Sequence, residues 1–214
     1  MAEVKNNHIQ SVFEERLNAL THGVGALMGV AALVLLIIFN TEKTKWSLFS
    51  VIVYGLSIII LFSSSTLYHA VQTKNQKHYF RIIDHISIYL LIAGTYTPVA
   101  LIALDESKGW PIFWVVWTIA LLGLILKIFF TGKFEVFSVI LYLIMGWLIV
   151  IDFTNLANYI GTNGTLLLFA GGLFYTLGIA FYAIHKIPYN HVIWHLFVLV
   201  GAICHFFLVF FYVI

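Results

Sequence analysis

The sequence predicts an all-α integral membrane protein built as a bundle of seven transmembrane helices. Of its 214 residues, 62% are hydrophobic and only 9% are charged, and the mean hydropathy is +1.00. A soluble domain carries about 25% charged residues, so these charges are too few to cover a water-facing surface. The apolar residues also gather into runs of about 20, the length at which a helix crosses a bilayer.

Seven such runs follow one another along the chain. They lie near residues 17–39, 47–70, 82–104, 110–130, 134–153, 165–185 and 191–213. Short polar breaks separate them; the break at 131–133 is the weakest, and the two runs beside it could also form one long kinked segment. We therefore expect a polar, cytoplasmic N-terminal segment at 1–16, with no signal-peptide cleavage site after it, and a single membrane domain at 17–214.

Positive charges indicate the orientation of this bundle. The end at which the chain starts holds eight basic residues: Lys5, Arg16, Lys74, Lys77, Arg81, Lys127, Lys133 and Lys186. The opposite end holds three, Lys43, Lys45 and Lys108. The positive-inside rule places the N-terminus in the cytoplasm and the C-terminus outside, which is opposite to a G-protein-coupled receptor.

Composition also excludes other classes of protein. A formal net charge of +2 gives no basic surface for nucleic acid. The single cysteine, Cys204, cannot form an internal disulfide, which excludes a stapled secreted fold. The last predicted span contains no lysine that could carry a retinal Schiff base.

The predicted topology brings several ionisable residues to one depth near the cytoplasmic face. His69 ends the second span, and His191 and His195 begin the seventh. Residues four apart on a helix share one face, so the last two imidazoles can reach one zinc ion. With His69 as the third ligand, one tetrahedral position stays open for water, as in catalytic zinc sites.

Two further side chains complete this predicted site. Ser65 lies one turn before His69 and is placed to hydrogen-bond within it. Asp84, in the first turn of the third span, is the only carboxylate that we expect nearby, and it could hold or deprotonate a zinc-bound water.

Simpler interpretations of these residues stay open at this point. Histidines near helix ends are common because that region is wet. Asp84 could form a surface ion pair with Arg81, and Ser65 could serve only helix packing. We expect His22 and His85 to lie outside the site and His205 to be hydrogen-bonded between helices. Gly25 and Gly29 form a GxxxG step, which predicts close helix packing.

The same residues resemble the haemolysin III group, the bacterial branch of the progestin and adipoQ receptor superfamily. The matching segments are residues 15–23 (ERLNALTHG), 65–69 (STLYH), Asp84 followed by 94–98 (GTYTP), and 188–195 (PYNHVIWH), with a histidine at His205 as the family often has. The resemblance covers essentially the whole chain.

This resemblance implies more than the spacing does. It implies seven helices with the N-terminus inside, and a zinc ion held near the cytoplasmic face by His69, His191 and His195. It associates Asp84 with the zinc-bound water and Ser65 with the surroundings of the site. A shared pattern with alkaline ceramidases suggests hydrolysis of a lipid amide, and bacterial members are linked to haemolysis and to membrane-lipid homeostasis.

We therefore expect a zinc-dependent hydrolase in a bacterial plasma membrane, with a membrane lipid as its substrate. Two alternatives stay open. The protein could be a non-enzymatic sensor or receptor-like protein with a structural zinc, or a haemolysin-type cytolytic protein. The uniformly apolar helices argue against an aqueous pore, because they offer no polar stripe to line it. Three imidazoles would also suit other transition metals.

Overall fold

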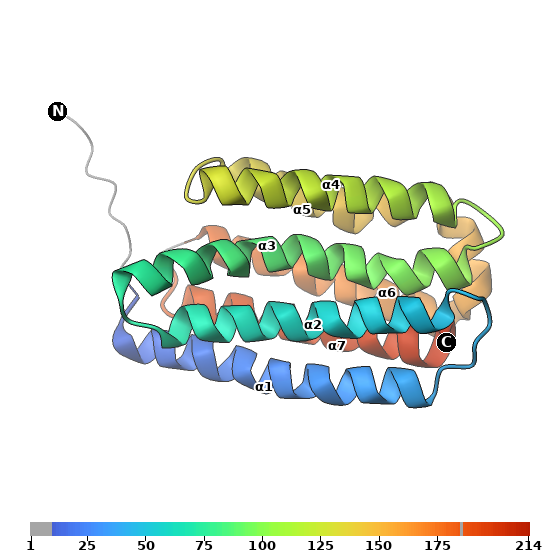
Figure 1. Cartoon of the computed structure of the whole chain (residues 1–214), viewed down its shortest axis with the longest axis horizontal. Coiled ribbons are helices and arrows are strands. Elements are labelled where there is room, and N and C mark those ends of the chain that lie inside the picture. Colours follow the sequence, from blue (N-terminus) through green and yellow to red (C-terminus); the bar gives the residue numbers. More distant parts are fainter. Residues whose placement is uncertain (1–9, 185) are drawn as a thin grey trace.

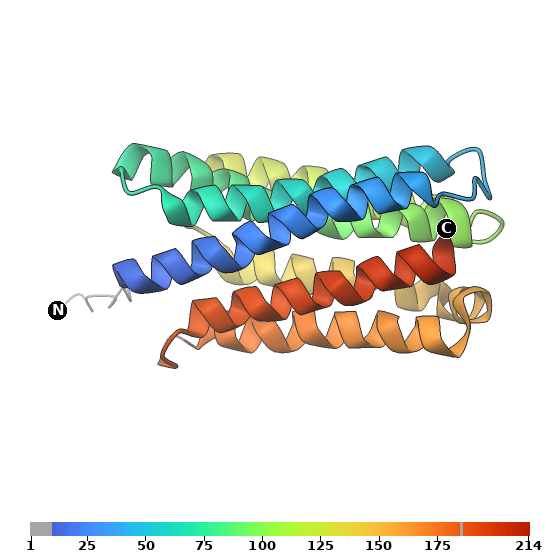
Figure 2. The same ribbon diagram turned by 90° about the horizontal axis from the view of Figure 1, so that it is seen from below.

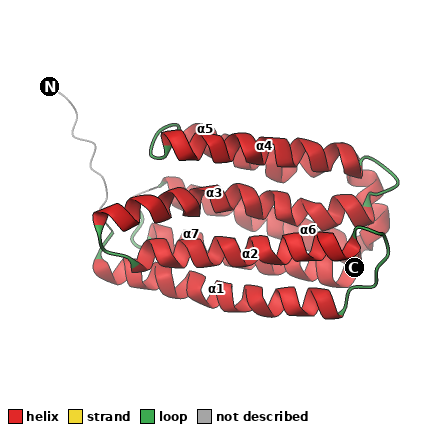
Figure 3. Cartoon of the chain, viewed as in Figure 1, coloured by secondary structure: helices red, strands yellow, loops and turns green. Residues whose placement is uncertain are grey.

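The described residues, 10–184 and 186–214 of this computed structural model, form helices joined by short loops. The α-helices are α1 (Val12–Ile38), α2 (Ser47–Ala70), α3 (Lys74–Pro98), α4 (Gly109–Phe130), α5 (Glu135–Trp147), α6 (Phe153–Ala183) and α7 (Asn190–Leu208). A π-helix at Val99–Ala103, a 3₁₀ helix at Leu148–Asp152 and a π-helix at Val209–Val213 extend three of them. The described part contains no strand (Figures 1 and 3), so the all-α prediction is confirmed.

Six helical stretches are long and apolar enough to cross a membrane. The stretch Glu135–Ala183, of 49 residues, counts as one of them, although it contains both α5 and α6. A 3₁₀ helix joins α5 to α6, and within α6 Gly161 leaves the helical conformation, with φ 67° and ψ −173°. Figure 2 shows the chain reversing direction inside this stretch.

The break that the sequence marks as weakest is in fact clear in the structure. Helix α4 ends at Phe130 and α5 begins at Glu135, with Gly132 and Phe134 at positive φ between them. The expected break between the fifth and sixth apolar runs is present as a kink, because Gly161 leaves the helical conformation between two helical segments.

Two helices begin earlier than their apolar runs. Helix α1 starts at Val12 rather than 17, because Ser11 and Glu14 form a capping box that satisfies its first backbone N–H groups. Helix α3 starts at Lys74 rather than 82. Part of the predicted segment 1–16 is therefore helical; its residues 1–9 lie outside the described part of the chain.

Helix α2 is closely packed against both α1 and α3. A Cβ atom on Gly25 of α1 would come within 2.6 Å of the Phe62 ring of α2, so the predicted close contact at the GxxxG step is present. On the other side of α2, a Cβ atom on Gly94 of α3 would overlap the side chain of Ser57. Helices α6 and α7 form a second pair, and α7 lies beside α1 (Figure 1).

The contact between Gly94 and Ser57 gives a test of this packing. We expect Gly94→Ala to destabilise the protein by about 1–3 kcal/mol, because the added methyl group separates α2 from α3. The size-swapped double variant Gly94→Ala/Ser57→Gly should recover much of that loss. Thermal unfolding in detergent measures both effects.

Gly146→Ala is the matched control, because a Cβ atom there would meet nothing within 4 Å. It should leave the melting temperature unchanged or raise it. Equal melting temperatures for Gly94→Ala and the wild type would contradict the close packing of α2 and α3.

Candidate metal centre

Three predicted ligands, His69 from α2 and His191 and His195 from α7, meet at the end of the bundle where the chain begins. One potential ligand atom from each lies within 4.8 Å of the others. The ring centroid of His69 lies 5.1 Å from that of His191 and 4.9 Å from that of His195. His69 and His195 are buried and His191 is half-buried.

Hydrogen bonds from α1 orient two of these rings. The Nδ1 atom of His69 lies 2.7 Å from a carboxylate oxygen of Glu15. The Nδ1 atom of His195 lies 3.3 Å from the backbone carbonyl of Asn18 and 3.4 Å from the hydroxyl of Thr21. Because carboxylate and carbonyl oxygens only accept, each Nδ1 carries a hydrogen, and each Nε2 is left with a lone pair.

This arrangement suits a metal ion. The Nε2 atom of His69 is buried and makes no hydrogen bond within the described chain, a costly state unless a further partner occupies that place. Metal-binding histidines commonly donate their other ring hydrogen to a carboxylate or backbone carbonyl, as His69 and His195 do here. Three imidazoles also leave one tetrahedral position open.

Helix α1 contributes residues that the sequence analysis did not place in the site. Glu15 holds His69 and also accepts a hydrogen bond of 2.6 Å from Lys77 of α3. His22 stacks on His195, with ring centroids 3.5 Å apart and an angle of 8° between the planes. A signal was available, since Glu15, Asn18 and His22 recur every three or four residues and therefore share one face of the helix.

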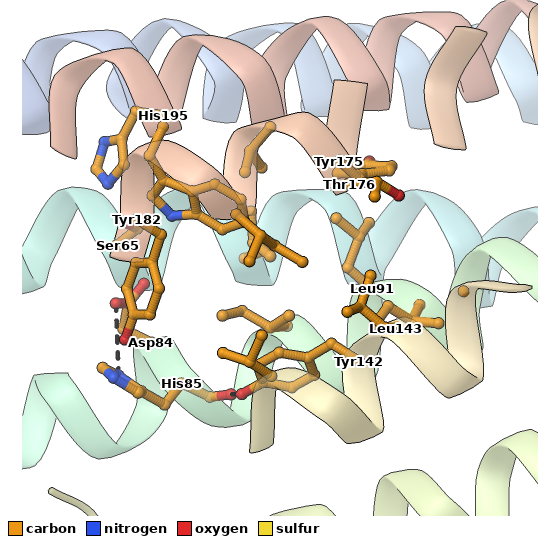
Figure 4. Close-up of a pocket in the computed structure, with 18 of the residues that line it drawn as sticks. Ser65, Asp84, His85, Leu91, Tyr142, Leu143, Tyr175, Thr176, Tyr182 and His195 are labelled. Atoms are coloured by element: carbon orange, nitrogen blue, oxygen red, sulfur yellow. Dashed lines mark hydrogen bonds and ion pairs between the residues drawn. The ribbon is translucent and has the colours of Figure 1, made fainter. Parts of the chain in front are cut away.

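The predicted Ser65 and Asp84 lie beside the histidines on a cavity of about 230 Å³. Figure 4 shows Ser65, Asp84 and Tyr182 at the same end of this cavity as His195. The Ser65 hydroxyl is buried and hydrogen-bonds to no described residue. One Asp84 oxygen lies 3.8 Å from the Nδ1 atom of His85.

Asp84 does not form the alternative ion pair with Arg81. Arg81 lies 3.6 Å from Glu135 of α5, which also pairs at 2.8 Å with the fully buried Lys127 of α4. His85 lies 3.9 Å from the same carboxylate and lines the cavity, so the prediction that it lies outside the site is wrong. This charge cluster joins α3, α4 and α5 at the end that holds the histidines.

The cavity becomes apolar beyond its polar end. Its lining also includes Leu91, Ile92, Val139, Leu143, Ile179 and Val198, and Figure 4 shows Leu91 and Leu143 on the side away from Ser65 and Asp84. The arrangement can therefore do three things together: hold a metal ion, present a carboxylate next to it, and accept a hydrocarbon chain.

Comparison with known proteins gives the family. The family model described as "Haemolysin-III related" matches residues 10–206. The chain is 44% identical to "Hemolysin-3" of Bacillus cereus over 215 residues, covering 100% of this chain and 98% of that protein. It is 44% identical to "Hemolysin-3 homolog" of Bacillus subtilis over 203 residues, covering 94% and 95% respectively.

A human protein is also similar. "Monocyte to macrophage differentiation factor" is 29% identical over 215 residues, covering 96% of this chain and 87% of that protein. The similarity thus extends through the helices that hold the three histidines. With the family model matching nearly the whole described chain, this membrane protein belongs to the haemolysin III family.

Proposed function

We propose that this protein is a zinc-dependent hydrolase of a lipid amide or related membrane lipid and contributes to membrane-lipid homeostasis. The observation that carries the proposal is the cluster of three histidines, two of which, His191 and His195, line a largely apolar cavity together with the carboxylate of Asp84. Zinc is the preferred ion because a three-imidazole ligand set with one open position is typical of its catalytic sites.

We further propose seven membrane crossings, with the N-terminus and the metal centre at the cytoplasmic face of a bacterial plasma membrane. The 49 residues of Glu135–Ala183 support two crossings, since about 20 residues cross a bilayer. The excess of Lys and Arg at the end with the histidines supports the orientation. The Bacillus relatives support a bacterial membrane.

In the proposed hydrolysis, each residue of the site would have a separate role. The metal, when bound, supplies Lewis-acid chemistry that polarises a carbonyl and acidifies water. Asp84 accepts a proton from the water whose oxygen attacks the amide carbon, and it returns that proton to the nitrogen as the C–N bond breaks. The buried Ser65 hydroxyl, which has no partner among the described residues, would donate to a bound group at this end of the cavity, and the apolar part of the cavity would hold the acyl chain.

The names of two relatives favour a cytolytic activity as a second candidate. The lipid-facing surfaces of the described helices carry large apolar side chains such as Leu27, Phe129 and Val136. They offer no polar wall for an aqueous pore, which favours the hydrolase. A third candidate is a sensor in which the metal only ties α2 to α7.

Metal content tests the proposed centre. We expect about one zinc ion per chain in protein purified without chelators or a histidine tag, and its loss in His69→Ala and His191→Ala. Elemental analysis measures this. His78→Ala is the control, because His78 is exposed and outside the three-histidine cluster. Wild-type protein without metal would contradict the proposal.

Glu15→Gln should weaken zinc binding by about 10- to 100-fold, because the amide loses the charge that the His69 hydrogen bond uses. Competition with a zinc-binding dye measures the affinity. Glu14→Gln makes the same change one residue earlier, in the helix cap, and should leave the affinity unchanged. Equal losses in both variants would indicate a general effect on α1 instead.

Asp84→Asn should lower the turnover of a lipid amide such as a ceramide by at least about 100-fold while zinc stays bound, because the amide cannot accept the proton. A mass-spectrometric assay of fatty-acid release, run beside elemental analysis, measures both quantities. Asp105→Asn, in the loop at the opposite end of the bundle, is the control. Full turnover in Asp84→Asn would favour the sensor with a structural metal.

A further inference from the structure

The cavity has a second group of polar residues, far from the metal centre. Tyr175 and Thr176 of α6 and His205 of α7 line it there. Figure 4 shows Tyr175 and Thr176 on the side away from Ser65 and Asp84. His205 follows His195 by ten residues of α7, which places it about 15 Å further along the helix. A polar side chain at such depth in a membrane is costly and indicates a functional site.

The hydrogen bond of His205 shows which of its two ring nitrogens can accept a hydrogen bond from a ligand. Its Nε2 atom lies 3.3 Å from the backbone carbonyl of Leu168. A carbonyl only accepts, so Nε2 carries the hydrogen and Nδ1 is an acceptor. No described residue hydrogen-bonds to this Nδ1 atom or to the hydroxyl of Tyr175, whose ring lies 5.5 Å from that of His205.

The neighbouring polar residue is already satisfied. The hydroxyl of Thr176 donates to the carbonyl of Gly172 at 2.7 Å and accepts from the indole N–H of Trp147 at 3.2 Å. Of Tyr175, Thr176 and His205, the hydroxyl of Tyr175 and the acceptor of His205 are therefore the groups that remain for a ligand.

The bundle is built to hold His205 in this place. A Cβ atom on Gly171 of α6 would overlap the His205 ring, so the absence of a side chain there gives the ring its position. His205 also lines a second cavity, of about 190 Å³, which shares Gly146, Trp147 and Gly172 with the first. The ring thus lies at the junction of two cavities.

An unmodified hydrocarbon chain does not match this end. It would cover the Nδ1 atom of His205 and the Tyr175 hydroxyl without bonding to either, and unpaired buried polar groups disfavour binding. A hydroxyl group on the chain satisfies both, since it donates to Nδ1 and accepts from the tyrosine. The apolar residues between the two ends of the cavity fit the hydrocarbon that joins them.

We propose that the far end of the cavity, formed by Tyr175 and His205, is a binding site for a hydroxyl group on the chain of the lipid. The ligand is then a lipid whose acyl chain carries a hydroxyl far from its carbonyl carbon. This inference rests on the proposed function in one respect, that the reacting group lies at the three histidines.

Two fatty acids that differ by one hydroxyl test the site. In displacement of a fluorescent fatty acid from the purified full-length chain, 12-hydroxystearic acid should bind at least about tenfold more tightly than stearic acid. Tyr175→Phe and His205→Leu should each remove most of this preference while stearic acid binds as before. Tyr159→Phe, which changes a tyrosine outside the cavity, should keep it.

Equal binding of the two acids by the wild type overturns the inference, and so does a preference that survives in Tyr175→Phe. Should His205→Leu not fold, Tyr175→Phe decides alone, because it removes only the hydroxyl. Hydrolysis assays separate the two proposals. Equal turnover of stearoyl and 12-hydroxystearoyl amides, with equal binding, overturns this site and leaves the hydrolase intact. A Tyr175-dependent preference without any hydrolysis overturns the hydrolase and leaves the site.

Discussion

The hydrogen bond between His69 and Glu15 is the contact on which the candidate centre depends. It joins α2 to α1, and through Lys77 the same carboxylate reaches α3. On the other side of α1, Asn18 and Thr21 hold His195 of α7. Helix α1 therefore fixes ligands from two helices that are distant in sequence. Without α1, no hydrogen bond from that helix would hold the Nδ1 atoms of His69 and His195, and the orientation of their Nε2 atoms would no longer be fixed.

A membrane makes such pairing obligatory, because unpaired polar groups in an apolar medium are costly. The fully buried Lys127 obeys this rule through its ion pair with Glu135. The Nε2 atom of His69 does not, since it has no partner among the described residues. The same reasoning links the two proposals: each places a ligand where the bundle leaves a polar group unsatisfied, a metal ion at His69 and a hydroxyl group at His205.

Particular residues show where prediction from sequence succeeds and fails. The meeting of His69, His191 and His195 follows from antiparallel topology and from helical spacing, both of which are readable in the sequence. The positions of His22 and His85 do not follow, because a helix can rotate about its axis and only its neighbours fix the angle. Likewise Gly132 and Gly161 both adopt positive φ, yet the first lies in a loop between α4 and α5 and the second lies at a kink within α6.

The sequence by itself determined the membrane class, the all-α fold and the family, because composition, apolar run length and ordered motifs are properties of the chain. It also placed the three histidines, Ser65 and Asp84 at one end of the bundle. Only the tertiary structure decided which groups orient the histidines, that Arg81 pairs with Glu135 rather than Asp84, and that the cavity is polar at both ends. These depend on helix rotation and on side-chain packing between segments up to 177 positions apart, which no local pattern encodes.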